Sequence, residues 1–132
     1  MKIGIIGTGY VGLTTALTFA KLGFKVYGND KDKEKIEKLK NGICPIYEPG
    51  LDELLKEMLE ANQIEFLEDI VQTIKLSDVI FICVGTPTNP DGSPDLSQVE
   101  EVSRIIAENL NGYKLIVEKS TVPVQTEQWI KW

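Results

Sequence analysis

Three glycines near the start of the chain have the spacing of a phosphate-binding turn. The apolar run at residues 2–6 leads directly into Gly7, Gly9 and Gly12, which form a G-x-G-x-x-G pattern. In such a turn the first glycine permits a tight bend, the second lets the backbone approach a pyrophosphate, and the third lets the next helix pack closely on the strand. The free N–H groups at the start of that helix would face the phosphates. The pattern predicts a dinucleotide-binding turn. A glycine-rich connection with no ligand is the alternative interpretation.

An acidic residue follows the glycines at the distance that dinucleotide binding requires. A second extended pattern at residues 25–29 ends at Asp30, and dinucleotide folds place their ribose acid roughly 20 residues after the glycine turn. A carboxylate at that place accepts hydrogen bonds from ribose hydroxyls. Capping of the next helix is the alternative role for Asp30.

Composition and charge limit the possible functions. The 132 residues are 42% hydrophobic, which suits the core of one domain. A net charge of -6 disfavours nucleic acid or an anionic membrane surface as a partner. We see neither a signal peptide nor an apolar run of roughly 20 residues, so we expect a cytoplasmic protein without a membrane span.

The titratable residues point away from metal chemistry. The sequence has no histidine, and Cys44 and Cys83 lack the spacing of a metal site. We therefore expect no metal and two unbridged thiols, with Cys83 as a small core residue at the end of an apolar run. The base that oxidation of an alcohol requires must be another kind of group or lie elsewhere.

Extended and helical patterns alternate along the chain. We predict strands at residues 2–6, 25–29, 64–67, 79–84 and 115–117. We predict helices from Leu13 to an end at Gly23, and at 31–40, 51–59, 70–75 and 96–110, the last with Asp95 as its N-cap. This alternation predicts an α/β fold with a doubly wound parallel sheet in the order 3-2-1-4-5, ending before a sixth strand. The glycine turn, Asp30, Val84 to Thr88 and Ser120 to Val122 would then line one crevice at the carboxyl ends of the strands.

Four motifs in this order resemble a known family. They are Gly7 to Gly12, Ile46 to Leu51, Val84 to Thr88 and Glu118 to Val124. Together they are similar to the UDP-glucose/GDP-mannose dehydrogenase family, and within it to the UDP-glucose 6-dehydrogenases. The resemblance implies that residues 1–132 are the N-terminal NAD-binding domain of a longer, homo-oligomeric enzyme, which also has a central helix and a substrate domain. That enzyme would oxidise UDP-glucose to UDP-glucuronate in two NAD-dependent steps, through a thioester on a cysteine.

The resemblance also implies roles for individual residues. The cofactor would contact Gly7, Thr8, Gly9, Tyr10, Val11 and Gly12 in the turn, Asp30 and Lys35 at its ribose, Val84, Gly85, Thr86, Pro87 and Thr88 after the fourth strand, and Ser120, Thr121 and Val122 after the fifth. Thr121 is similar to a family threonine that positions a water and the catalytic groups, so it is the catalytic candidate. Lys35 as an ordinary solvated lysine and Thr121 as a turn hydroxyl remain open.

The sequence departs from the family pattern in two ways. Neither Cys44 nor Cys83 stands in the thioester motif, and Gln125 stands where many relatives have glycine. The substrate-binding residues would lie beyond residue 132. Sister activities on GDP-mannose or UDP-N-acetylmannosamine therefore stay open, as does a nucleotide-binding module without chemistry.

Overall fold

The computed structural model describes residues 1–46 and 48–119. Its strands are β1 (Lys2–Ile6), β2 (Lys25–Asn29), β3 (Ile64–Leu67), β4 (Val79–Ile82) and β5 (Leu115–Glu118). Its helices are α1 (Tyr10–Lys21), α2 (Lys33–Lys40), α3 (Leu51–Glu60), α4 (Ile70–Leu76) and α5 (Ser97–Glu108). Within these ranges, none of the helices is long and apolar enough to cross a bilayer.

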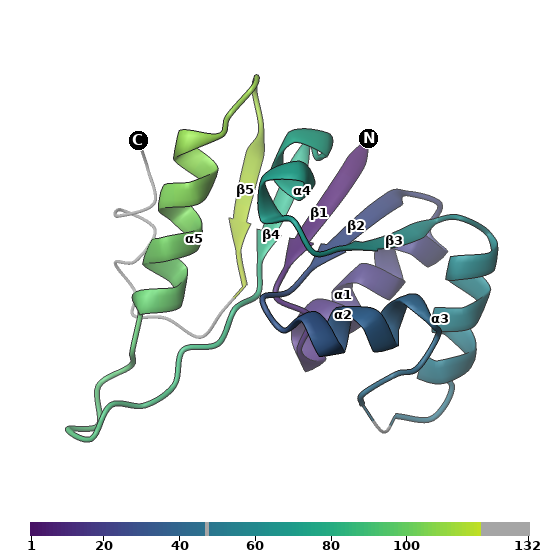
Figure 1. Cartoon of the computed structure of the whole chain (residues 1–132), viewed down its shortest axis with the longest axis horizontal. Helices are drawn as coiled ribbons and strands as arrows, with labels where there is room; N and C mark the ends of the chain where they lie inside the picture. The colour runs from purple at the N-terminus through teal and green to yellow at the C-terminus, as the bar shows by residue number, and fades with distance from the viewer. Residues whose placement is uncertain (47, 120–132) are drawn as a thin grey trace.

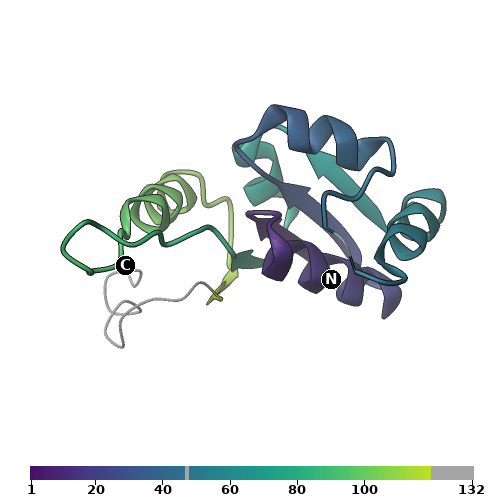
Figure 2. The ribbon, with the colours of Figure 1, turned by 90° about the horizontal axis from the view of Figure 1, so that it is seen from below.

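The five strands form one parallel sheet in the order β3-β2-β1-β4-β5, which confirms the predicted topology. Figure 1 shows β5 and α5 at one edge of the sheet and β3 with α3 at the other. Seen from below in Figure 2, α5 lies at one end of the molecule, α3 at the other and α1 between them. The order of the strands reverses direction between β1 and β4, and this is the point at which doubly wound sheets bind ligands.

Alternate residues of β1 face two separate cores. Ile5 packs in a cluster with Leu13 and Leu17 of α1, and the same cluster holds the apolar residues of α2 and α3. Ile6 packs in a second cluster with Ile74 of α4 and Ile106 of α5. Helices therefore cover both faces of the sheet, and both faces of the central strands are buried.

Several element boundaries differ from the predicted ones. Helix α2 begins at Lys33 because the side chain of Asp32 caps it, accepting hydrogen bonds from the amides of Glu34 and Lys35. Helix α5 begins at Ser97 with Leu96 as its N-cap, so the prediction of Asp95 as N-cap was wrong. The carboxylate of Asp95 nevertheless accepts a hydrogen bond from the amide of Ser97, at 2.9 Å.

Candidate functional site

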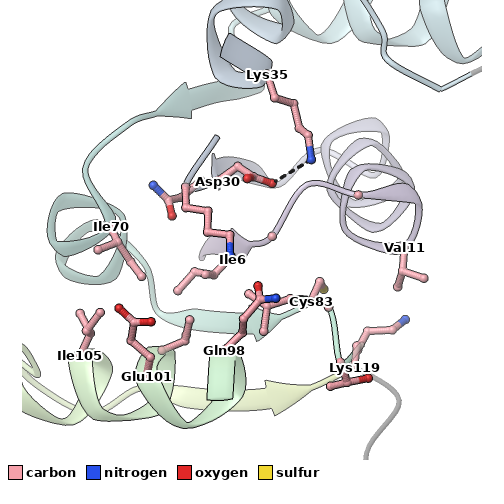
Figure 3. Close-up of a pocket in the computed structure, with 18 of the residues that line it drawn as sticks. Ile6, Val11, Asp30, Lys35, Ile70, Cys83, Gln98, Glu101, Ile105 and Lys119 are labelled. Carbon is pink, nitrogen blue, oxygen red and sulfur yellow. Dashed lines mark hydrogen bonds and ion pairs between the residues drawn. The ribbon is translucent and has the colours of Figure 1, made fainter. Parts of the chain in front are cut away.

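A crevice of about 620 Å³ opens at the carboxyl ends of β1 and β4. Figure 3 shows residues from the glycine turn, α4, α5 and the end of β5 around it. Nine residues predicted to bind a cofactor line it: Gly7, Gly9, Tyr10, Val11, Asp30, Lys35, Val84, Gly85 and Thr86. The structure thus brings three separated parts of the sequence together at the switch point of the sheet.

The fold itself requires two of the three glycines in the turn. Gly7 has a φ of +98°, and a Cβ there would lie 2.6 Å from the carbonyl oxygen of Cys83. A Cβ at Gly12 would overlap the carbonyl oxygen of Gly7, because α1 passes so close to the turn. Gly9 is different, since a Cβ built there meets nothing within 4 Å and its φ of -72° suits any residue. The space beside Gly9 is therefore open to a ligand.

Helix α1 directs its N-terminus at this open space. Gly9 is the N-cap and supplies no side chain, and the first turn of the helix contains no acidic residue. The first amides of a helix have no partner within the helix, and the helix dipole places partial positive charge at the same end. The arrangement suits a diphosphate, because its oxygens would accept hydrogen bonds from these amides.

Asp30 ties the glycine turn to the end of β2. Its Oδ2 accepts hydrogen bonds from the amide and the hydroxyl of Thr8, both at 2.9 Å, and lies 3.4 Å from Nζ of Lys35. Its Oδ1 accepts a hydrogen bond from the amide of Asp32 at 3.0 Å. Asp32 caps α2, so the alternative that Asp30 is the cap was wrong.

These contacts keep the Asp30 carboxylate ionised. Burial by itself would raise the pKa of Asp30, but hydrogen bonds from Asp32 and Thr8, together with the charge of Lys35, hold this pKa below its ordinary value. A charged acceptor therefore stands next to the turn at neutral pH. Lys35 keeps further N–H groups for a ligand, because an ammonium carries three donors.

Some predicted residues do not line the crevice. Thr8 is fully buried and its hydroxyl donates a hydrogen bond to Asp30, and Gly12 is buried against the turn. Pro87 is absent from the crevice wall, and Thr88 forms an isolated antiparallel bridge with Pro94. Ser120, Thr121 and Val122 lie outside the described residues.

Other residues of the crevice were not predicted. They are Ile6, Asn29, Lys31, Glu68, Ile70, Cys83, Gln98, Glu101, Val102, Ile105 and Lys119. Four of them lie on α5 at the spacing i, i+3, i+4 and i+7, so one side of this helix forms a wall of the crevice. The amphipathic pattern of residues 96–110 indicated that one side of this helix is buried. That pattern alone does not distinguish a helix side that faces the core from one that faces a ligand pocket.

Cys83 lies in the crevice wall and only partly in the core that was predicted for it. Its burial raises its pKa to about 11, an effect opposed by the charge of Lys119 and reinforced by that of Glu118. Cys83 is therefore a protonated thiol at neutral pH and a poor nucleophile. Cys44 is also a free thiol, and its burial raises its pKa.

The loop before α3 contacts the glycine turn. The hydroxyl of Tyr10 donates a hydrogen bond to Oε1 of Glu48 at 3.1 Å, and Gly50 precedes the helix with a φ of +84°. The hydrogen bond to Glu48 and its negative charge raise the pKa of Tyr10. Glu48 of this motif thus contacts the rim of the crevice through Tyr10, next to the N-terminus of α1.

Comparison with known proteins identifies the family. The model of the UDP-glucose/GDP-mannose dehydrogenase family, NAD binding domain, matches residues 1–132. The chain belongs to this family. Its fold agrees with that of a solved UDP-glucose dehydrogenase from Pyrobaculum islandicum, at a TM-score of 0.90 and 40% identity over 95% of this chain and 30% of that one. The NAD-binding domain is the part of the family that the matching model describes.

Individual relatives carry names of several related dehydrogenases. A UDP-glucose 6-dehydrogenase of Bacillus subtilis is 48% identical over 98% of this chain and 28% of its own length. A UDP-N-acetyl-D-mannosamine dehydrogenase of Pyrococcus horikoshii is 40% identical over 97% of this chain and 30% of its own length. A solved ternary complex of the GDP-mannose dehydrogenase of Pseudomonas aeruginosa superposes with a TM-score of 0.93 at 35% identity, over 98% of this chain and 30% of that one. The chain thus spans less than a third of the length of these relatives.

Proposed function

We propose that this chain is the NAD-binding part of a dehydrogenase that oxidises UDP-glucose to UDP-glucuronate in two NAD-dependent steps. The open space beside Gly9, at the uncapped N-terminus of α1, is the observation that carries the proposal. The 48% identity with a UDP-glucose 6-dehydrogenase supports the choice of sugar nucleotide.

We propose that different residues of the crevice bind different parts of the cofactor. The amides of Tyr10, Val11 and Gly12 hold the diphosphate, and Asp30 and Lys35 hold the hydroxyls of the adenosine ribose. Oδ1 of Asp30 accepts one hydrogen bond, from Asp32, so it has a lone pair to offer. Val84, Gly85 and Thr86 form the wall after β4. When bound, NAD accepts the hydride that leaves the sugar alcohol.

The remaining chemistry requires a base and a nucleophile. Oxidation of an alcohol needs a base for the hydroxyl proton, and the sequence has no histidine. Cys83 is protonated at neutral pH and makes a poor nucleophile for the second oxidation. We therefore propose that a substrate-binding part beyond this domain supplies the base and the nucleophile, with Thr121 in a positioning role. The chain by itself should bind NAD without producing NADH from UDP-glucose.

A substrate panel tests the proposal. The protein encoded by the whole reading frame should reduce two NAD for each UDP-glucose, followed as absorbance of NADH. UDP-N-acetylmannosamine and GDP-mannose are the competitors, because relatives with these names also match. Preference for either competitor would overturn the assignment of the sugar nucleotide. Absence of NAD binding in calorimetry would overturn the role of the domain itself.

A further inference from the structure

The two ends of the crevice differ in chemistry. Figure 3 shows Val11, Cys83 and Lys119 at one end, next to the start of α1, and Ile70, Ile105 and Glu101 at the other. Asp30 lies between them. A dinucleotide with its diphosphate at α1 and its ribose at Asp30 must therefore direct the attached base toward the second end.

The second end has apolar walls. Ile70 begins α4 and Ile105 lies on α5, and both are half-buried and pack against the second core cluster. Their exposed parts face the crevice. Such side chains suit the faces of a flat base, which gains binding free energy by covering apolar surface.

Glu101 brings a carboxylate to this end of the crevice. It lies one helical turn before Ile105 on α5, lines the crevice and directs its carboxylate toward Ile70 in Figure 3. An ionised carboxylate only accepts hydrogen bonds, and it repels an anionic ligand unless that ligand offers a donor. At the edge of a purine the suitable donor is an amino group at position 6, which adenine has and hypoxanthine lacks.

We propose that Glu101 selects the base of the dinucleotide by accepting a hydrogen bond from the 6-amino group of adenine, with Ile70 and Ile105 on the faces of the ring. The inference rests on the proposed cofactor site and adds a residue that determines specificity. A 6-oxo purine would turn an acceptor oxygen toward a carboxylate placed at position 6. Its nearest donor, the N1–H, lies one position further along the ring edge, so the base must shift to restore a hydrogen bond and should bind more weakly.

Nicotinamide hypoxanthine dinucleotide provides the test, because it differs from NAD at this position and carries the same phosphates. By titration calorimetry, the intact protein should bind NAD about five-fold more tightly than the hypoxanthine analogue, as expected for one partly exposed hydrogen bond to a charged group. In Glu101→Gln the two affinities should become equal, since the amide can turn to donate to the oxo group. The ratio of the two affinities cancels the general effect of removing a negative charge.

Glu100→Gln is the matched control. Glu100 precedes Glu101 on α5, is exposed and does not line the crevice, so the same change of charge there should leave the ratio at its wild-type value. Equal affinities in the wild-type protein, or an unchanged ratio in Glu101→Gln, would overturn the inference while leaving the cofactor site intact. Binding of neither dinucleotide would overturn the proposed function as well.

Discussion

Substitutions at Gly9 and at Gly12 should affect different properties of the protein. Alanine or valine at Gly9 should affect cofactor binding, and alanine at Gly12 should affect stability. A side chain at Gly9 enters open space, with nothing within 4 Å of the Cβ and an ordinary φ of -72°. A Cβ at Gly12 overlaps the carbonyl oxygen of Gly7 and lies 3.2 Å from Cβ of Cys83. The first change therefore acts on the ligand, and the second acts on the fold.

The magnitudes follow from these contacts. Alanine is a weaker N-cap than glycine, but loss of glycine also reduces the entropy of the unfolded chain, and the two effects oppose each other at about 0.5 kcal/mol each. Gly9→Ala should thus unfold with a free energy close to that of the wild type. Gly12→Ala must push α1 away from the turn, and overpacking of this kind costs about 1–3 kcal/mol. Gly9→Val adds a branched side chain where the diphosphate would approach the backbone, so NAD binding should be lost.

Urea unfolding and NAD titration by calorimetry separate the outcomes. Gly9→Val should keep its circular dichroism spectrum and lose measurable heat of binding, whereas Gly12→Ala should show a lower urea midpoint with an unchanged slope. A folded Gly9→Val protein with wild-type affinity for NAD would refute the assignment of the phosphate site. An unchanged midpoint in Gly12→Ala would refute the steric argument.

Three further predictions concern charge in the crevice. Asp30→Asn replaces one carboxylate oxygen by a donor, so either Thr8 or the amide of Asp32 loses its acceptor, and this should cost about 1–3 kcal/mol at pH 7. Since the folded-state pKa of Asp30 is lowered, its stabilisation is present above the unfolded pKa of about 3.9 and is lost as the pH falls through the folded pKa. Urea unfolding across pH should therefore show the mutant and the wild type converging in acid, and a constant gap would contradict this. NADP should bind at least about ten-fold more weakly than NAD in calorimetry, because its 2′-phosphate meets the Asp30 carboxylate, and equal affinities would count against the ribose role. Cys83, with its pKa raised to about 11, should react with iodoacetamide at pH 8 about a hundred-fold more slowly than glutathione, measured by mass spectrometry, and a comparable rate would contradict its protonated state.

The sequence predicted the sheet because its signals were local and agreed with one another. The apolar run in β1, the glycine turn and the apolar face of α1 each specify neighbouring backbone, and all five strands pair in the expected order. Boundaries were less certain where side-chain capping decides them. The sequence pattern predicted that α2 starts at residue 31 and gave Asp30 as a possible cap. The geometry shows instead that Asp32 caps α2, while Asp30 turns back to Thr8.

The site residues that local backbone geometry positions were predicted from the sequence. The site residues that the packing of distant elements positions were missed. The spacing of Gly7, Gly9 and Asp30 predicted that they lie together, and all three line the crevice. Glu101 and Ile105 are ordinary positions of an amphipathic helix, and they line the crevice only because α5 packs beside the end of β4. Lys31, which follows Asp30 directly, also lines the crevice and was not predicted there. The sole arginine of the sequence, Arg104, lies exposed on α5 with Oε1 of Glu108 at 4.0 Å.

In the proposed cofactor site Asp30 has two roles, because it orders the glycine turn and then accepts hydrogen bonds from the ribose. Its Oδ2 fixes Thr8, and with it the path of the turn between Gly7 and Gly9, before any ligand arrives. The turn therefore loses its conformational entropy on folding, and cofactor binding does not have to order it. This preorganisation raises the affinity for the diphosphate. Because the same carboxylate is ionised at neutral pH, the turn stays ordered and the acceptor stays charged over the physiological range. If Asp30 only bound the ribose, its replacement by glutamate would cause a modest loss of affinity for NAD. The longer side chain of glutamate at position 30 would shift the contact with Thr8, so it should weaken binding of ADP, which has the diphosphate and the ribose but no nicotinamide, as strongly as binding of NAD.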